Sequence, residues 1–209
     1  MTRSRSRSRA KRARRAAGRS TRRRGARLLI LAVGAIFLSA VCVGIVLAAR
    51  AAQHRPLAWI LALAALELAM RALRLVGRGR RYLVGAAAER RVARRLRRLR
   101  RYGWIAVHDV DRGAGNIDHV IAGPGGIATI ETKLTRAGRR EIAQARAHAA
   151  WAAAHAGRPV VPILCLAARE ARPQLVAGVW IVGVRHLPRF VRHLRGPAAD
   201  PALLTVLTS

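Results

Sequence analysis

A run of 22 residues without a charge, residues 28–49, is the feature that most constrains this chain. As an α-helix it would be about 33 Å long, and the hydrocarbon core of a bilayer is about 30 Å thick. A cleaved secretory signal, with Arg22-Arg23 as its basic element, is the alternative. The run is longer than the apolar core of about 7–15 residues in such signals. The sequence therefore predicts a membrane-spanning helix over residues 28–49.

A second apolar segment, residues 57–70, is too short to cross a bilayer unless the helix extends to Val76. That extension requires Arg71 and Arg74 to reach the interface with their long side chains. Glu67, inside the segment, can pair with Arg71 one turn away. A helix lying on the membrane surface is the alternative.

Basic residues flank the two apolar segments very unevenly. Residues 1–27 hold 13 and residues 71–101 hold another 13, whereas the connection between the segments has only Arg50 and Arg55. The positive-inside rule places both basic flanks in the cytoplasm, so the chain must cross the cell membrane twice. We therefore predict a disordered Arg-rich tail (1–27), a two-helix membrane anchor (28–76) and a cytoplasmic domain (77–209).

The charge balance narrows the possible partners. The chain has 41 Lys and Arg against 9 Asp and Glu, a formal net charge of +32. Such a charge favours anionic partners, either nucleic acid or a membrane with acidic lipids. The hydrophobic fraction of 52% excludes a chain that is disordered throughout, and two cysteines exclude a disulfide-built scaffold.

Residues 84–101 are predicted to form a helix with one apolar face. Glu89 lies on that face, so its carboxylate needs a partner, a proton or a metal. A buried ion pair with an arginine, with no functional role, is the alternative. The arginines of the remaining surface are expected to contact phosphates, or else acidic headgroups. The predicted nucleic-acid contacts are Arg90, Arg91, Arg94, Arg95 and Arg98.

Three short segments joined by glycine-rich turns, at residues 104–110, 117–122 and 127–133, predict an antiparallel meander. Because side chains alternate between the faces of a strand, Asp118 can face Glu131 and Lys133 on the next strand. Two carboxylates suit a hard cation such as Mg²⁺, and a nearby Lys can orient a water and offset phosphate charge. The alternative is an exposed Glu131–Lys133 ion pair of little consequence.

The rest of the chain predicts a helix at 139–156, strands at 159–167 and 176–184, a short helix at 187–194 and a closing strand at 203–207. Together these elements make an α/β mixed sheet flanked by helices. Gln144 lies on the inward face of the 139–156 helix, either as a site residue or as an ordinary buried amide. His148 and His155 are seven residues apart, which does not match a helical zinc pair.

Several of these motifs resemble the nuclease-related domain (NERD) family, which in turn resembles the PD-(D/E)xK nucleases. The motifs lie within residues 82–185: Gly85-Ala86-Ala87-Ala88-Glu89, Trp104, His108-Asp109-Val110, Asn116-Ile117-Asp118-His119, Gly123-Pro124-Gly125-Gly126, Glu131-Thr132-Lys133 and Gln144. Ala88 departs from a glycine often found there, and residues 134–138 lack the family's common aromatic residue. The resemblance implies a restriction-endonuclease-like fold.

The resemblance also implies roles. Asp118, Glu131 and the backbone carbonyl of Thr132 would bind Mg²⁺ or Mn²⁺, and Lys133 would serve the water and the phosphate. Glu89 would assist the metal, and Gln144 would support the site from its helix. The implied function is metal-dependent hydrolysis of phosphodiester bonds, in DNA rather than RNA, at the membrane. The alternative is a non-catalytic module that tethers nucleic acid or lipid at the cytoplasmic membrane face.

Overall fold

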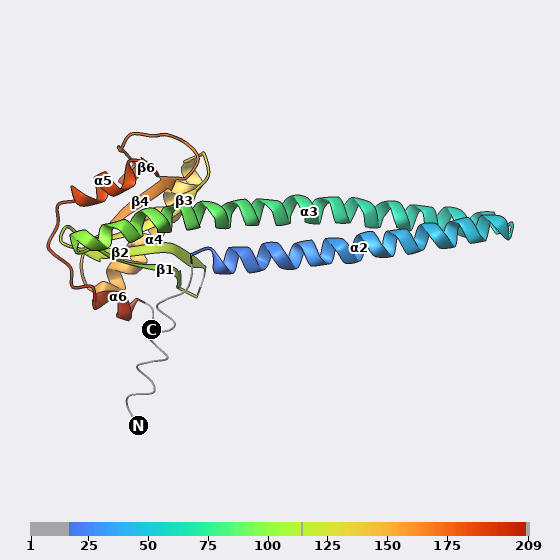
Figure 1. Ribbon diagram of the computed structural model, residues 1–209, viewed down its shortest axis with the longest axis horizontal. Coiled ribbons are helices and arrows are strands. Elements are labelled where there is room, and N and C mark those ends of the chain that lie inside the picture. The colour runs from blue at the N-terminus through green and yellow to red at the C-terminus, as the bar shows by residue number, and fades with distance from the viewer. Residues whose placement is uncertain (1–16, 114, 208–209) are drawn as a thin grey trace, which may run out of the picture. The chain divides into compact units, whose positions relative to one another are not determined.

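The computed structural model describes residues 17–113 and 115–207. Residues Ser20–Val84 form one compact unit, and the chain from Gly85 onward forms most of the other. The first unit is built from α2 (Arg19–Ala51) and the first part of α3 (Arg55–Arg97). The second unit begins with the end of α3 and continues through η1 (Arg98–Tyr102), β1 (Ile105–Asp111), β2 (Asn116–Gly123), β3 (Gly126–Lys133), α4 (Arg139–Ala156), β4 (Val160–Leu166), β5 (Gln174–Val176), β6 (Val179–Gly183), α5 (Leu187–Arg192) and α6 (Leu203–Val206) (Figure 1).

Helices α2 and α3 are both long and apolar enough to cross a membrane. Residues 19–27, which the sequence analysis assigned to a disordered tail, form the first turns of α2 instead. Arginine is a good helix former, and adding residues to an existing apolar helix needs no new nucleation. Residues 17 and 18 of that predicted tail form a turn before α2, and residues 1–16 lie outside the described residues.

Small residues form the contact between α2 and α3 within the first unit. On α3 the buried positions recur every seven residues, at Ala58, Ala65, Ala72 and Gly79. On α2 they include Gly25 and Ala32. A seven-residue repeat keeps one face of each helix toward the other, and small side chains let the backbones approach closely.

Large apolar side chains of the same unit point away from that contact. Phe37 is 70% exposed, and Leu31, Leu47, Trp59 and Leu63 are each at least 60% exposed. This distribution is the reverse of a water-soluble hairpin, in which the large apolar residues would lie between the helices.

Replacing Gly25 with leucine is expected to weaken the hairpin. A Cβ there would lie 3.1 Å from the carbonyl oxygen of Gly79 and 3.1 Å from Cβ of Tyr82. We expect a cost of about 1–3 kcal/mol, as for other overpacked sites, read as a lower thermal midpoint of the full chain in detergent. Gly34→Leu is the matched control, because a Cβ at Gly34 meets nothing within 4 Å. Equal midpoints for the two variants would contradict the packing described above.

The second unit is a six-stranded mixed sheet in the order β1-β2-β3-β4-β6-β5. Strands β1, β2 and β3 form the predicted antiparallel meander. Helix α4 then returns the chain so that β4 pairs parallel to β3, as a crossover helix does. The C-terminal part of α3 and α5 pack on one face of the sheet, and α4 and α6 pack on the other. The predicted class, a mixed α/β sheet flanked by helices, is confirmed.

Two predicted strands are wrong in detail. Most of the predicted strand 176–184 is β6, but its first residues form a tight turn that joins β6 to β5, a strand that was not predicted. Ala177 and Gly178 in this turn have positive φ, 48° and 77°, the conformation that matches strand twist in a two-residue hairpin. Residues 203–207, predicted as a closing strand, form helix α6. The Asp200 carboxylate accepts the N–H of Ala202 at 2.7 Å, and Pro201 already has a helical φ, so the segment begins as a helix.

Candidate active site

Strands β2 and β3 separate where the candidate residues lie. The last paired residues at that end of the ladder are His119 and Ile130. One step further the register would place Asp118 opposite Glu131. Instead of a backbone carbonyl, the Asp118 carboxylate accepts the N–H of Thr132 at 2.7 Å. The side chain therefore satisfies a backbone donor that the ladder has left open, and Asp118 is held next to β3.

Four side chains converge at the end of β3. The Lys133 ammonium donates to Oε1 of Glu131 at 2.9 Å and to Oε1 of Gln144 at 3.2 Å. Gln144 comes from α4, and His148, one turn further along the same helix, places Nδ1 3.0 Å from Oε2 of Glu131. Helix α4 thus lies against β3 with two polar residues on one face, because i and i+4 positions share a face.

The two carboxylates have opposite pKa shifts. Burial, together with the charges of Glu131 and Glu89, raises the pKa of Asp118 well above its ordinary value, against the opposing effects of Thr132 and Lys133. Burial alone would also raise the pKa of Glu131, but His148 and Lys133 outweigh it, so the net shift is downward. When neighbouring carboxylates carry more negative charge than the nearby cations neutralise, they favour binding a further cation or a proton.

The donor set fits a divalent metal ion. Oε2 of Glu131 is buried, and the Nδ1 atom of His148 approaches it to 3.0 Å. A buried carboxylate is costly unless hydrogen bonds or a cation compensate its charge. In the described part of the chain, no three His, Cys, Asp or Glu side chains are placed so that together they could hold a metal ion. If Asp118 and Glu131 supplied the protein ligands of a Mg²⁺ ion, most of its coordination positions would be filled by water, as is usual for this ion.

Glu89 lies on α3 with only 8% of its surface exposed. The sequence analysis placed it on the inward face, and the structure does the same. Its charge reaches Asp118, because it contributes to the raised pKa of that carboxyl. Glu89 is therefore positioned to add a third negative charge near the pair on the sheet.

A second polar group lies behind Thr132 and was not predicted. His119 is completely buried; its Nε2 lies 3.3 Å from Oγ1 of Thr132 and its Nδ1 lies 2.9 Å from Nδ1 of His108. One of the two Nδ1 atoms must donate and the other accept, so the two rings cannot both be positively charged. Burial lowers the pKa of both histidines, and the neighbouring His108 lowers that of His119 further.

Acidification is therefore expected to destabilise the domain through this histidine pair. Because the folded-state pKa values are below the unfolded value of about 6.5, the unfolded chain binds more protons as the pH falls through 6.5. Each histidine can contribute a slope of up to about 1.4 kcal/mol per pH unit. The measurement is the free energy of unfolding between pH 7.5 and 5.5 for the full chain and for His108→Gln/His119→Gln.

The raised pKa of Asp118 has the opposite effect, because it makes the folded state bind more protons. Asp118 is present in both the parent and the double variant, so its effect cancels in the difference between their slopes of unfolding free energy against pH. We expect the double variant to be less destabilised by acid than the parent. His155→Gln, at an exposed site on α4, is the control and should leave the slope unaltered. A double variant with the parent's slope would show that the pair does not remain neutral in the fold.

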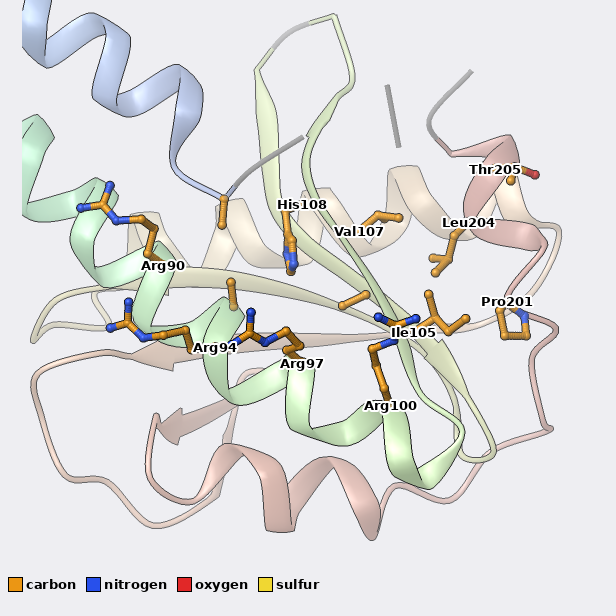
Figure 2. A pocket seen from close by; sticks show the side chains of 13 residues that line it. Arg90, Arg94, Arg97, Arg100, Ile105, Val107, His108, Pro201, Leu204 and Thr205 are labelled. Carbon is orange, nitrogen blue, oxygen red and sulfur yellow. The ribbon is translucent and has the colours of Figure 1, made fainter. Parts of the chain in front are cut away.

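A groove of about 730 Å³ runs along α3 and η1 beside the edge strand β1. Figure 2 shows four arginines in a row on the helical side of this groove: Arg90, Arg94, Arg97 and Arg100. The opposite side is mainly apolar, with Ile105 and Val107 of β1 and Leu204 of α6. His108 also lines the groove and connects through His119 to the strand that carries Asp118. We call it the α3–β1 groove.

The five arginines predicted to contact nucleic acid do not form one surface. Arg90 and Arg94 line the α3–β1 groove. Arg91 donates to the carbonyl oxygen of Ala167 at 3.0 Å, which ties α3 to the end of β4. Arg95 and Arg98 line a different depression on the other flank of the helix.

Some residues of this site were not predicted. His148 was expected on the same helix face as Gln144 but was weighed only as a zinc ligand, and its contact with Glu131 was not foreseen. Arg97 and Arg100 were not singled out, because their position beside β1 depends on how the helix packs against the sheet. Asp109 has a φ of 56° and accepts Nδ2 of Asn116 at 2.6 Å, a side-chain link across the β1–β2 turn that no pattern indicated.

Comparison with known proteins identifies a family for part of the chain. Residues 84–167 match the family described as the nuclease-related domain, NERD. The matched segment includes Glu89, Asp118, the Glu131-Thr132-Lys133 motif, Gln144 and His148. The resemblance stated from the motifs is thereby confirmed. No curated protein and no solved structure matches the chain.

Proposed function

We propose, from the nuclease-related domain formed by residues 84–167, that this protein is a membrane-anchored nuclease that hydrolyses phosphodiester bonds in DNA with the help of Mg²⁺ or Mn²⁺. The observation that carries the proposal is the convergence of Lys133, Glu131 and Gln144 beside Asp118. A surface ion pair would not be built this way, because Glu131 is only 4% exposed and its partners come from two elements.

Asp118, Glu131 and the carbonyl oxygen of Thr132 are the groups that would hold the ion. When bound, a divalent cation lowers the pKa of a coordinated water and offsets negative charge on the phosphate. Lys133 has three N–H donors, of which two bind Glu131 and Gln144, so the third is available for a phosphate oxygen or the attacking water. His148 and Lys133 fix the Glu131 carboxylate from two sides, and the Thr132 N–H fixes Asp118.

The test is Mn²⁺ binding and plasmid cleavage by the full chain in detergent, beside Asp118→Asn and Glu131→Gln. Loss of even an indirect metal partner typically costs 10–100-fold, so we expect each variant to lose at least about 100-fold in cleavage and to bind Mn²⁺ more weakly. Glu170→Gln, which removes an exposed carboxylate, is the control. Cleavage at the parent's rate in either site variant would refute the assignment, and DNA binding without cleavage by the parent would favour the tethering module.

We also propose that α2 and α3 cross the membrane as a hairpin, with the nuclease-related domain in the cytoplasm. Their length and composition, the small residues between them and the large apolar side chains outside support this arrangement. The uneven distribution of arginine supports the orientation.

The proposed topology predicts the accessibility of engineered cysteines. In intact cells a membrane-impermeant maleimide should label Gln53→Cys, between the helices, and should reach the exposed Thr135→Cys only after lysis. Native Cys165 is buried and Cys42 lies within α2, so neither should interfere strongly. Labelling of both engineered positions from the same side would contradict the hairpin.

A further inference from the structure

A second arginine-rich depression, of about 460 Å³, lies on the other flank of α3 and η1 from the α3–β1 groove. Helix α5 forms its other wall, because α5 packs against η1. Its arginines come from segments about 90 residues apart in the sequence: Arg95, Arg98, Arg101, Arg185, Arg189 and Arg192. The fold alone brings these two groups of cations together, and we call the feature the η1–α5 depression.

The cations of the η1–α5 depression are poorly neutralised. Among the described residues the one carboxylate within ion-pair distance is Glu170, 3.6 Å from Arg185, and that pair is largely exposed. Clustered charges of one sign repel each other and raise the local potential, so such a cluster attracts anions. A single phosphate contacted by two guanidinium groups would relieve the repulsion with paired hydrogen bonds.

Tyr102 orders two of these side chains. The guanidinium of Arg192 lies 4.1 Å from the centroid of its ring, and that of Arg101 lies 4.9 Å away. Cation–π contacts hold the planar groups in place and leave their N–H donors for another partner. Arginines fixed in this way lose less conformational entropy on binding than freely rotating ones.

We propose that the η1–α5 depression binds the phosphate backbone of a nucleic acid, at a point separate from the α3–β1 groove and from Lys133. That the depression binds an anion follows from its charge; that the anion is a nucleic acid rests on the proposed function. A bilayer surface fits less well, because the feature is concave. Its large exposed apolar residue, Tyr102, lies against two guanidinium groups and is not free to insert among lipids.

Two grooves on opposite flanks of one helical segment can be reached together only by a long ligand. Each phosphate contact releases bound counterions, so the logarithm of affinity falls with the logarithm of salt in proportion to the number of contacts. Removing two arginines of the η1–α5 depression should therefore weaken the binding of a 40-base-pair duplex and reduce its salt slope by about two. A 6-base oligonucleotide that binds in the α3–β1 groove should be affected much less.

The experiment compares Arg189→Gln/Arg192→Gln with Arg169→Gln/Arg172→Gln in the full chain held in neutral-lipid nanodiscs. The control pair loses the same charge from the exposed loop before β5, which lines neither groove. Each variant also carries Lys133→Met, so that the DNA stays intact. We expect about a tenfold loss of duplex affinity at 0.1 M salt for the first pair and about twofold or less for the control. Equal losses would overturn the proposal.

Two further experiments distinguish nucleic-acid binding in the depression from lipid binding, and from a failure of the proposed nuclease activity. If phosphatidylserine in the nanodisc abolishes the difference between the two variants while raising the thermal midpoint of the parent alone, the depression binds acidic lipid and the proposal is wrong. With Lys133 intact, Arg189→Gln/Arg192→Gln should cleave DNA more slowly than the parent at DNA concentrations below saturation. The control pair Arg169→Gln/Arg172→Gln should cleave at the parent's rate. If the parent never cleaves DNA but Arg189→Gln/Arg192→Gln still shows the expected loss of affinity, the nuclease is refuted and the nucleic-acid site in the depression is supported.

Discussion

Replacing Lys133 with methionine is expected to lower the cleavage rate at least about 1000-fold without unfolding the protein. The Lys133 ammonium contacts both Glu131 and Gln144. A preorganised donor aimed at developing charge contributes about 100- to 1000-fold on its own. Methionine has a similar length and no charge, and the site is 30% exposed, so the fold should accept it. Glu131 would in addition lose its hydrogen bond to Lys133.

The measurement is the single-turnover rate of plasmid cleavage, with the thermal midpoint as the check on folding. Arg136→Met is the matched control, because it removes an exposed positive charge three residues further along the chain. A loss of less than about tenfold for Lys133→Met would mean that the lysine only neutralises charge in general. An equal loss in the control would point to the same conclusion.

Truncating Ile163 to alanine is expected to destabilise the domain by about 3–4 kcal/mol. Ile163 is completely buried at the centre of β4, between β3 and β6, in the core shared by α3, the sheet and α5. Fully buried isoleucines replaced by alanine cost about 2–5 kcal/mol, since the site loses apolar contacts and cannot collapse around the cavity.

Chemical denaturation followed by the fluorescence of Trp104 and Trp180, which both belong to this core, measures the effect. Ile163→Val removes one methyl group and should cost about 1 kcal/mol. A cost below about 1 kcal/mol for the alanine variant would indicate that β4 is not the packed centre of the sheet.

Local patterns were sufficient for most of the elements and for the residues of the site that lie on neighbouring strands. Asp118, Glu131 and Lys133 could be predicted because alternation fixes which side chains share a face and glycine turns fix which strands are neighbours. Gln144 could be predicted as inward-facing from helical periodicity. These inferences need only short-range geometry.

The remaining features depend on packing between distant segments. The contact of His148 with Glu131 requires the rotation of α4 over β3, and the division of the arginines between two grooves requires the positions of β1, α5 and α6. The periodicity of residues 90–101 places all of these arginines on one broad surface, and the neighbouring elements decide which flank each one lines. Helix α6 was predicted as a strand because four apolar residues carry little periodic signal, although Asp200-Pro201 was a helix-start signal.

The most direct test of the whole account is cleavage of supercoiled plasmid by the full chain in neutral-lipid nanodiscs, with Mg²⁺, with Mn²⁺ and with EDTA. We predict nicked and linear DNA with either metal ion, none with EDTA, and none with Asp118→Asn. Intact plasmid under every condition, from a folded protein that binds the DNA, would contradict the nuclease and leave the arginine-lined grooves as the functional part of the domain.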